Sequence, residues 1–86
     1  MQPQDSIPLF LKARHSPPAK AVEMLRPVIS MLRHIEPHGI EAHEASLALS
    51  SLVEGLTAET DMLEPLWDIA FVRLGAFEHS LPASGL

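Results

Sequence analysis

The sequence contains no cysteine and no tyrosine, and it has only four glycines among its 86 residues. The absence of cysteine excludes a disulfide framework, thiolate metal sites and a cysteine nucleophile. The glycines form neither a Gly-x-x-x-x-Gly-Lys nor a Gly-x-Gly-x-x-Gly motif, so a phosphate-binding loop is not expected. No serine stands in a Gly-x-Ser-x-Gly motif. We therefore expect neither an enzyme nor a bound cofactor.

Long apolar runs are also absent from the sequence. No stretch approaches the roughly 18 uninterrupted apolar residues that suggest a transmembrane helix. Residues 1–5 lack a basic region followed by an apolar run, so no signal peptide is expected. β-Branched residues do not alternate with polar ones, which argues against strands. These absences favour a cytoplasmic protein without membrane association.

The composition is that of a folded domain. Hydrophobic residues make up 47% of the chain and charged residues 20%, which argues against general disorder. We expect residues 1–86 to form a single helical domain, with flexible tails at 1–5 and 80–86. A chain this short buries only about 60% of the surface that its unfolded state exposes, so its margin of stability is narrow.

Apolar residues recur at alternating steps of three and four in three stretches, which is the pattern of one helix face. The predicted helices run from Ser16-Pro17-Pro18 to about Ile35, over about 40–55 and over about 61–79, and Ser6 caps a shorter helix over about 7–14. These patterns predict an all-α fold, a small antiparallel bundle of three main helices plus a short N-terminal helix. The three stripes are Ala21, Leu25, Val28, Leu32 and Ile35; Ala42, Ala45, Leu49, Leu52 and Leu56; and Leu63, Trp67, Ala70, Leu74 and Phe77.

Prolines and glycines mark the expected irregularities. Pro27 lies inside the second helix, where proline costs about 3 kcal/mol in regular geometry. Because the apolar pattern keeps its phase across Pro27, we expect a kink rather than a break. Pro37-His38-Gly39 ends this helix, and the glycine permits a positive backbone angle. Gly55 is the expected end of the third helix, with Thr57 or Thr60 capping the last one.

The chain holds more apolar residues than the three stripes contain. One three-helix core cannot easily bury them all, so we expect some to be exposed in a monomer and to drive self-association, most simply as a homodimer. The additional apolar residues are Met24, Ile29, Met31, Ile40, Leu47, Val53, Met62, Leu66, Ile69, Phe71 and Val72.

The net charge of −5 is unevenly distributed along the chain. Residues 1–40 carry five basic and three acidic side chains, whereas residues 41–86 carry one basic and eight acidic side chains. An acidic half repels nucleic-acid phosphates and anionic lipid, so direct nucleic-acid binding is not expected. It favours a basic protein partner, although a charge run most often forms only a solvated face.

Two groups of residues are the candidates for partner binding. Within its stripe Trp67 is more typical of a core residue, but if exposed it becomes the leading hot-spot candidate. The second group is acidic; it would complement the charge of a basic partner and steer its approach. The apolar candidates are Leu63, Leu66, Trp67, Phe71 and Leu74, and the acidic candidates are Glu54, Glu59, Asp61, Glu64 and Asp68.

Three histidines form the one cluster that could hold a metal. His34, His38 and His43 fall within ten residues, among glutamates, and imidazole with carboxylate suits zinc. Their spacing fits a zinc site poorly, because Pro37 and Gly39 interrupt the helix between them. Exposed histidines near a helix end are the simpler interpretation.

The function that we expect is protein binding by a small acidic helical module with a regulatory or adaptor role. One alternative is an inhibitor of the phage or antitoxin type, whose carboxylates replace nucleic-acid phosphates and block a basic target. That alternative requires the carboxylates of residues 54–68 to lie on one face. A metal-binding module using the three histidines is the other alternative. Many small bacterial and phage proteins share the helical pattern, and a shared pattern does not transfer function.

Overall fold

The computed structural model describes residues 5–35 and 39–81. This part of the chain is all-α, as the sequence predicts, and it contains no strand. The four helices are α1 (Ser6–Arg14), α2 (Pro18–Ile35), α3 (Ile40–Thr57) and α4 (Leu63–His79). None of these helices is both long and apolar enough to cross a membrane, within the residues that the structure describes.

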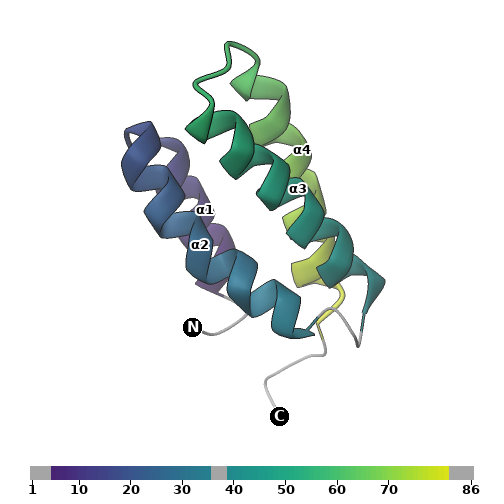
Figure 1. Cartoon of the computed structure of the whole chain (residues 1–86). Helices are drawn as coiled ribbons and strands as arrows, with labels where there is room; N and C mark the ends of the chain where they lie inside the picture. The colour runs from purple at the N-terminus through teal and green to yellow at the C-terminus, as the bar shows by residue number, and fades with distance from the viewer. Residues whose placement is uncertain (1–4, 36–38, 82–86) are drawn as a thin grey trace.

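The helices form a closed ring around one core. Each helix packs on the helices before and after it in the chain, and α1 also packs on α4. The α1–α2 pair therefore lies beside the α3–α4 pair, and successive helices run in opposite directions (Figure 1). The side where α2 meets α3 is consequently opposite the side where α1 meets α4.

The core consists of the predicted stripes together with two residues of α1. All stripe residues are buried except Ile35 and Leu63, which lie at helix ends and are partly buried. Phe10 and Ala13 of α1 are fully buried. The ring of Phe10 meets the indole of Trp67 edge-on, with 5.3 Å between the ring centroids. This short helix is thus a full member of the core.

The predictions for Pro27 and for Gly39 have different outcomes. Helix α2 continues through Pro27, which is exposed, so no break occurs there. The backbone of Gly39 is extended, with φ −171°, and the positive angle expected of it is absent. Among the described residues the positive φ occurs at Glu59, at 56°, in the turn after α3. Of the predicted Pro37-His38-Gly39 stop, residues 37 and 38 lie outside the described part.

The prediction that Gly55 ends the third helix is wrong. Helix α3 runs two residues further, to Thr57. The glycine instead lies where α4 approaches closely, since a Cβ atom added to it would lie 2.7 Å from Cδ1 of Leu66 and would require that side chain to shift. The prediction of a threonine cap is also wrong, because Met62 precedes α4. The hydroxyl of Thr60 accepts a hydrogen bond of 3.4 Å from the Met62 amide within the turn.

Residues Ser80 and Leu81, predicted to belong to a tail, close the end of α4. The Ser80 hydroxyl donates a 2.6 Å hydrogen bond to the carbonyl of Phe77. Leu81 is partly buried against the core. The remaining predicted tail residues, apart from Asp5, lie outside the described part of the chain.

Candidate interaction surface

The five apolar candidates do not form one surface. Trp67 is 5% exposed and Leu74 is fully buried, because the stripe of α4 faces the centre of the ring. Leu63 and Leu66 are partly buried beside Gly55. Phe71 is 42% exposed and lies against Phe10 of α1, with 6.1 Å between the ring centroids. In the folded chain, partner contacts by Trp67 and Leu74 are therefore blocked by the core.

Two of the acidic candidates are engaged by α1. One terminal nitrogen of Arg14 lies 2.9 Å from Oε2 of Glu64 and 2.9 Å from Oδ1 of Asp68. The hydrogen bonds to Asp68 and then to Glu64 raise the pKa of Arg14 above its ordinary value. The arginine side chain is 25% exposed. These carboxylates consequently hold α1 against the beginning of α4.

The other acidic candidates lie at two different places. Glu54 lines a hollow between α2 and α3, on the opposite side of the ring from Arg14. Glu59 and Asp61 are exposed in the connection between α3 and α4. The carboxylates of residues 54–68 are thus spread around the bundle, and the one acidic face that the nucleic-acid mimic requires does not form.

Several of the additional apolar residues are exposed, as the excess of such residues predicted. In a small monomer, exposed aliphatic side chains that gather in one region commonly mark an interaction surface. The exposed large apolar residues are Leu11 at 42%, Ile40 at 68%, Leu47 at 56%, Met62 at 67%, Ile69 at 52%, Phe71 at 42% and Val72 at 65%.

Three of these exposed residues gather where α3 and α4 pack together. Two shallow hollows meet at Arg73: one of about 280 Å³ extends along α3 past Leu47, and one of about 340 Å³ extends along α4 between Ile69 and Val72. Arg73 also pairs with Glu44 across the two helices, with 3.3 Å between Nη1 and Oε2. We call this region the α3–α4 face; it comprises Glu44, Leu47, Ala48, Ser51, Asp68, Ile69, Val72 and Arg73.

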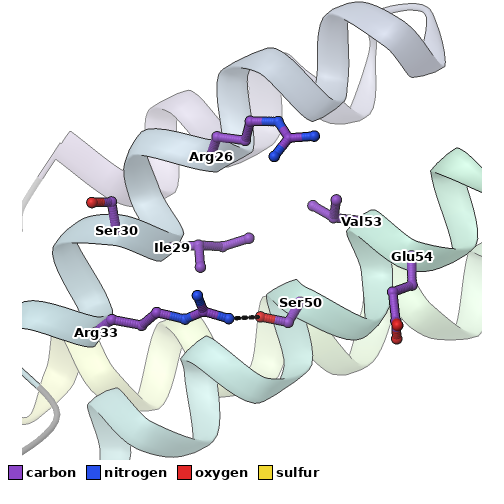
Figure 2. A pocket seen from close by; sticks show the side chains of 7 residues that line it. All are labelled: Arg26, Ile29, Ser30, Arg33, Ser50, Val53 and Glu54. Atoms are coloured by element: carbon purple, nitrogen blue, oxygen red, sulfur yellow. Dashed lines mark hydrogen bonds between the residues drawn. The ribbon is translucent and has the colours of Figure 1, made fainter.

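A larger hollow of about 520 Å³ lies between α2 and α3, and we call it the α2–α3 groove. Figure 2 shows Arg26 and Arg33 extending from α2 toward α3, with Ile29 between them and Val53 opposite. Arg33 donates a 3.4 Å hydrogen bond to the hydroxyl of Ser50. The complete lining is Arg26, Ile29, Ser30, Arg33, Ser50, Val53 and Glu54.

Neither Arg26 nor Arg33 was among the residues predicted from the sequence to form a site. Their separation of seven residues was the available signal, because seven residues are nearly two helical turns and place both side chains on one face. The groove itself depends on how α2 packs on α3, which the periodicity of a single helix does not specify.

The predicted histidine cluster is only partly within the described chain. His34 is exposed in the last turn of α2, and His43 is exposed in the first turn of α3. His38 lies outside the described residues. Among residues 5–35 and 39–81, no three histidine or carboxylate side chains are placed to hold a metal ion.

Comparison with protein families, with curated proteins and with solved structures finds no match to this chain.

Proposed function

We propose that this chain is a small helical protein-interaction module that self-associates through the α3–α4 face and acts as a regulatory or adaptor component. The observation that supports this proposal is the exposure of Leu47, Ile69 and Val72 on two neighbouring helices, each exposed by more than half. Removing such aliphatic surface from water yields about 25 cal/mol per Å², which favours covering it with another protein surface.

The charges of the α3–α4 face favour a second copy of the same chain as the occupant. The face carries one basic side chain, Arg73, and two acidic ones, Glu44 and Asp68. Asp68 is paired with Arg14, whereas Glu44 and Arg73 lie within reach of each other and are about half-exposed. In a two-fold dimer, a contact from residue i of one copy to residue j of the other occurs twice, so a face that holds the Glu44 and Arg73 pair can complement itself. The Glu44 carboxylate of one copy would pair with the Arg73 guanidinium of the other.

The overall acidity of the chain does not oppose this arrangement strongly. Glu54, Glu59 and Asp61 lie away from the α3–α4 face, and the carboxylate of Asp68, at its edge, is held by Arg14. Exposed charges separated by more than about 8 Å are largely screened at physiological ionic strength. Salt therefore weakens the repulsion between these carboxylates of the two copies.

The mass in solution tests the proposal. Light scattering after size exclusion, measured across a range of protein concentrations, should give a dimer that dissociates on dilution. Leu47→Glu combined with Ile69→Glu should give a monomer with an unchanged helical circular-dichroism spectrum, because both side chains are exposed in the monomer. The control is Leu11→Glu, which alters an exposed apolar residue on α1 and should leave the dimer intact.

A charge-exchange experiment tests the arrangement of the two copies. Glu44→Arg alone and Arg73→Glu alone each place like charges opposite one another in the dimer, and each should weaken it. An equimolar mixture of the two variants should form a heterodimer, because the arginine introduced at position 44 of one copy faces the glutamate introduced at position 73 of the other.

Two outcomes would overturn the proposed function. The first is a strict monomer at every concentration. The second is a dimer that Leu47→Glu with Ile69→Glu leaves unchanged, since this would place the interface elsewhere.

A further inference from the structure

The α2–α3 groove combines two arginine side chains with an apolar floor. Among the described residues, neither Arg26 nor Arg33 is in an ion pair, whereas Arg14 and Arg73 are. Within the same part of the chain, the only hydrogen bond of these two guanidinium groups is the 3.4 Å contact from Arg33 to Ser50, which is long and involves a neutral acceptor. No carboxylate of the described residues therefore pairs with either group, which favours carboxylates of a partner as their ligands.

The shape of the groove favours an elongated occupant over a small molecule. Small-molecule sites bury about 70–90% of a drug-sized ligand. Every residue that lines the groove retains solvent exposure: Ile29, Ser50 and Val53 are only partly buried, and the remaining lining residues are exposed. A surface this shallow is better covered by a helix that lies along it, as in helix-in-groove recognition.

The spacing of the arginines specifies the chemistry of that helix. Residues 26 and 33 are seven apart, so their Cα atoms lie about 10.5 Å apart along α2 and on one side of it. A helix that lies along the groove repeats the same distance between its own residues i and i+7. Between those residues, positions i+3 and i+4 would face Ile29 and Val53 and should be apolar.

We infer that the α2–α3 groove binds an acidic amphipathic helix of a partner protein, with carboxylates at i and i+7 and apolar side chains at i+3 and i+4. Arg26 and Arg33 each bind one carboxylate, and Ile29 with Val53 contacts the apolar side chains. Glu54 stands at the edge of the groove and turns away from its centre (Figure 2), so a further carboxylate at that end is disfavoured. This site is distinct from the α3–α4 face, because α3 uses different sides for the two surfaces.

Peptide binding tests the inference on the full chain. The probe is a fluorescent synthetic helical peptide of about 18 residues, long enough to form helix in water. It carries Glu at i and i+7 and Leu at i+3 and i+4. One control peptide has both Glu residues replaced by Gln, and another moves the second Glu to i+5, on a different face. Fluorescence anisotropy should show saturable binding of the probe and weaker binding of both controls.

Variants of the groove locate the binding site. Arg26→Gln and Arg33→Gln should each raise the Kd by about two- to five-fold, as expected for partly exposed charge pairs. Reversal of both charges to Glu should raise it by more than about ten-fold, because attraction is replaced by repulsion. The matched control is Lys20→Gln, which removes an exposed charge of α2 outside the groove and should leave the Kd unchanged.

Three results would overturn the inference: no saturable binding of the probe, equal binding of the probe and the i+5 control, or equal losses in Lys20→Gln and Arg33→Gln. A single-stranded oligonucleotide that binds more tightly than the probe, and depends on Arg26 and Arg33, would also overturn it in favour of phosphate recognition. The monomeric Leu47→Glu with Ile69→Glu variant should bind the probe normally. Failure of self-association and failure of peptide binding are therefore distinguishable.

Discussion

The guanidinium carbon of Arg14 lies 6.0 Å from the ring centroid of Trp67, so the last residue of α1 covers the largest side chain of α4. The same guanidinium holds Glu64 and Asp68, which lie one turn apart near the start of α4. A cation over an indole contributes about 0.5–1 kcal/mol at a partly exposed site. One arginine thus attaches the shortest helix to the bundle through two ion pairs and a cation–π contact.

Arg14→Ala should lower the free energy of unfolding by about 1–2 kcal/mol, because it removes the cation–π contact and two exposed ion pairs. Urea denaturation followed by circular dichroism measures this change. The control Lys12→Ala removes an exposed α1 charge that forms none of the described ion pairs, and should change stability by less than about 0.5 kcal/mol. Equal effects of the two substitutions would contradict the assigned role of Arg14.

The pH dependence of this contribution follows from the raised pKa of Arg14. A base whose pKa is higher in the folded state contributes stability that is fully present below its unfolded pKa and is lost as the pH rises through the folded value. For arginine that loss begins only above about pH 12. Arg14 does not titrate in the neutral range. The loss in free energy of unfolding caused by Arg14→Ala should therefore not change there through titration of this arginine.

Replacement of a glycine by alanine should change the stability of the protein in opposite directions in α3 and in α4. Gly75→Ala should stabilise the protein by about 0.5–1 kcal/mol, because alanine favours helix and nothing lies within 4 Å of the added Cβ. Gly55→Ala should destabilise it by about 1 kcal/mol, because the overpacking against Leu66 exceeds the gain in helix propensity. Thermal and urea denaturation of both variants measure the two signs, and stabilisation by Gly55→Ala would show that Leu66 moves aside freely.

Pro27→Ala should stabilise the protein by about 1–2 kcal/mol. Proline in a helix interior is about 3 kcal/mol less favourable than alanine, and part of that difference is offset because proline restricts the unfolded chain. Pro18→Ala is the matched control, since Pro18 is the first residue of α2, where proline is tolerated. Urea denaturation should show a gain for Pro27→Ala alone. A loss of stability would mean that α2 requires the proline geometry.

Glu59→Gly should stabilise the protein by about 0.5–1 kcal/mol. Glu59 has φ 56°, a left-handed conformation that costs most residues about 1–2 kcal/mol and that glycine adopts freely. Glu59→Ala is the control, because it removes the same carboxylate but keeps the Cβ atom and the strain. Equal melting temperatures for the two variants would show that charge, and not backbone conformation, determines the effect.

The helices could be predicted from sequence because burial in this fold follows the helical period. The stripe from Ala21 to Leu32 is fully buried, as is the stripe from Ala42 to Leu52 apart from minimal exposure of Ala42. The prediction at Gly55 failed because a glycine that ends a helix and a glycine that admits a neighbouring side chain look the same in sequence. At Gly55 the glycine admits a neighbouring side chain, that of Leu66, which comes eleven residues later in the chain.

The candidate surfaces were less predictable than the helices. Trp67 and Leu74 were predicted to bind a partner. Both belong to the apolar stripe of α4, and such a stripe is the part of a helix that the core buries. The exposed residues Leu47 and Ile69 lie outside the stripes, and they line two hollows that adjoin at Arg73 only because α3 packs on α4. The same holds for Arg26 and Val53, which come from different helices.

Helix α3 presents different sides to the two surfaces, with Ser50 and Val53 on one and Leu47 and Ser51 on the other. A dimer formed through the α3–α4 face would leave both α2–α3 grooves open at its periphery. Such an assembly is bivalent, and a partner with two acidic helices would bind the second one at a high effective concentration. Its avidity could exceed the affinity of one groove by about 10²–10⁴. A weak affinity of each groove would then be enough for tight binding of such a partner. Because only the dimer is bivalent, this binding would depend on the concentration of the chain.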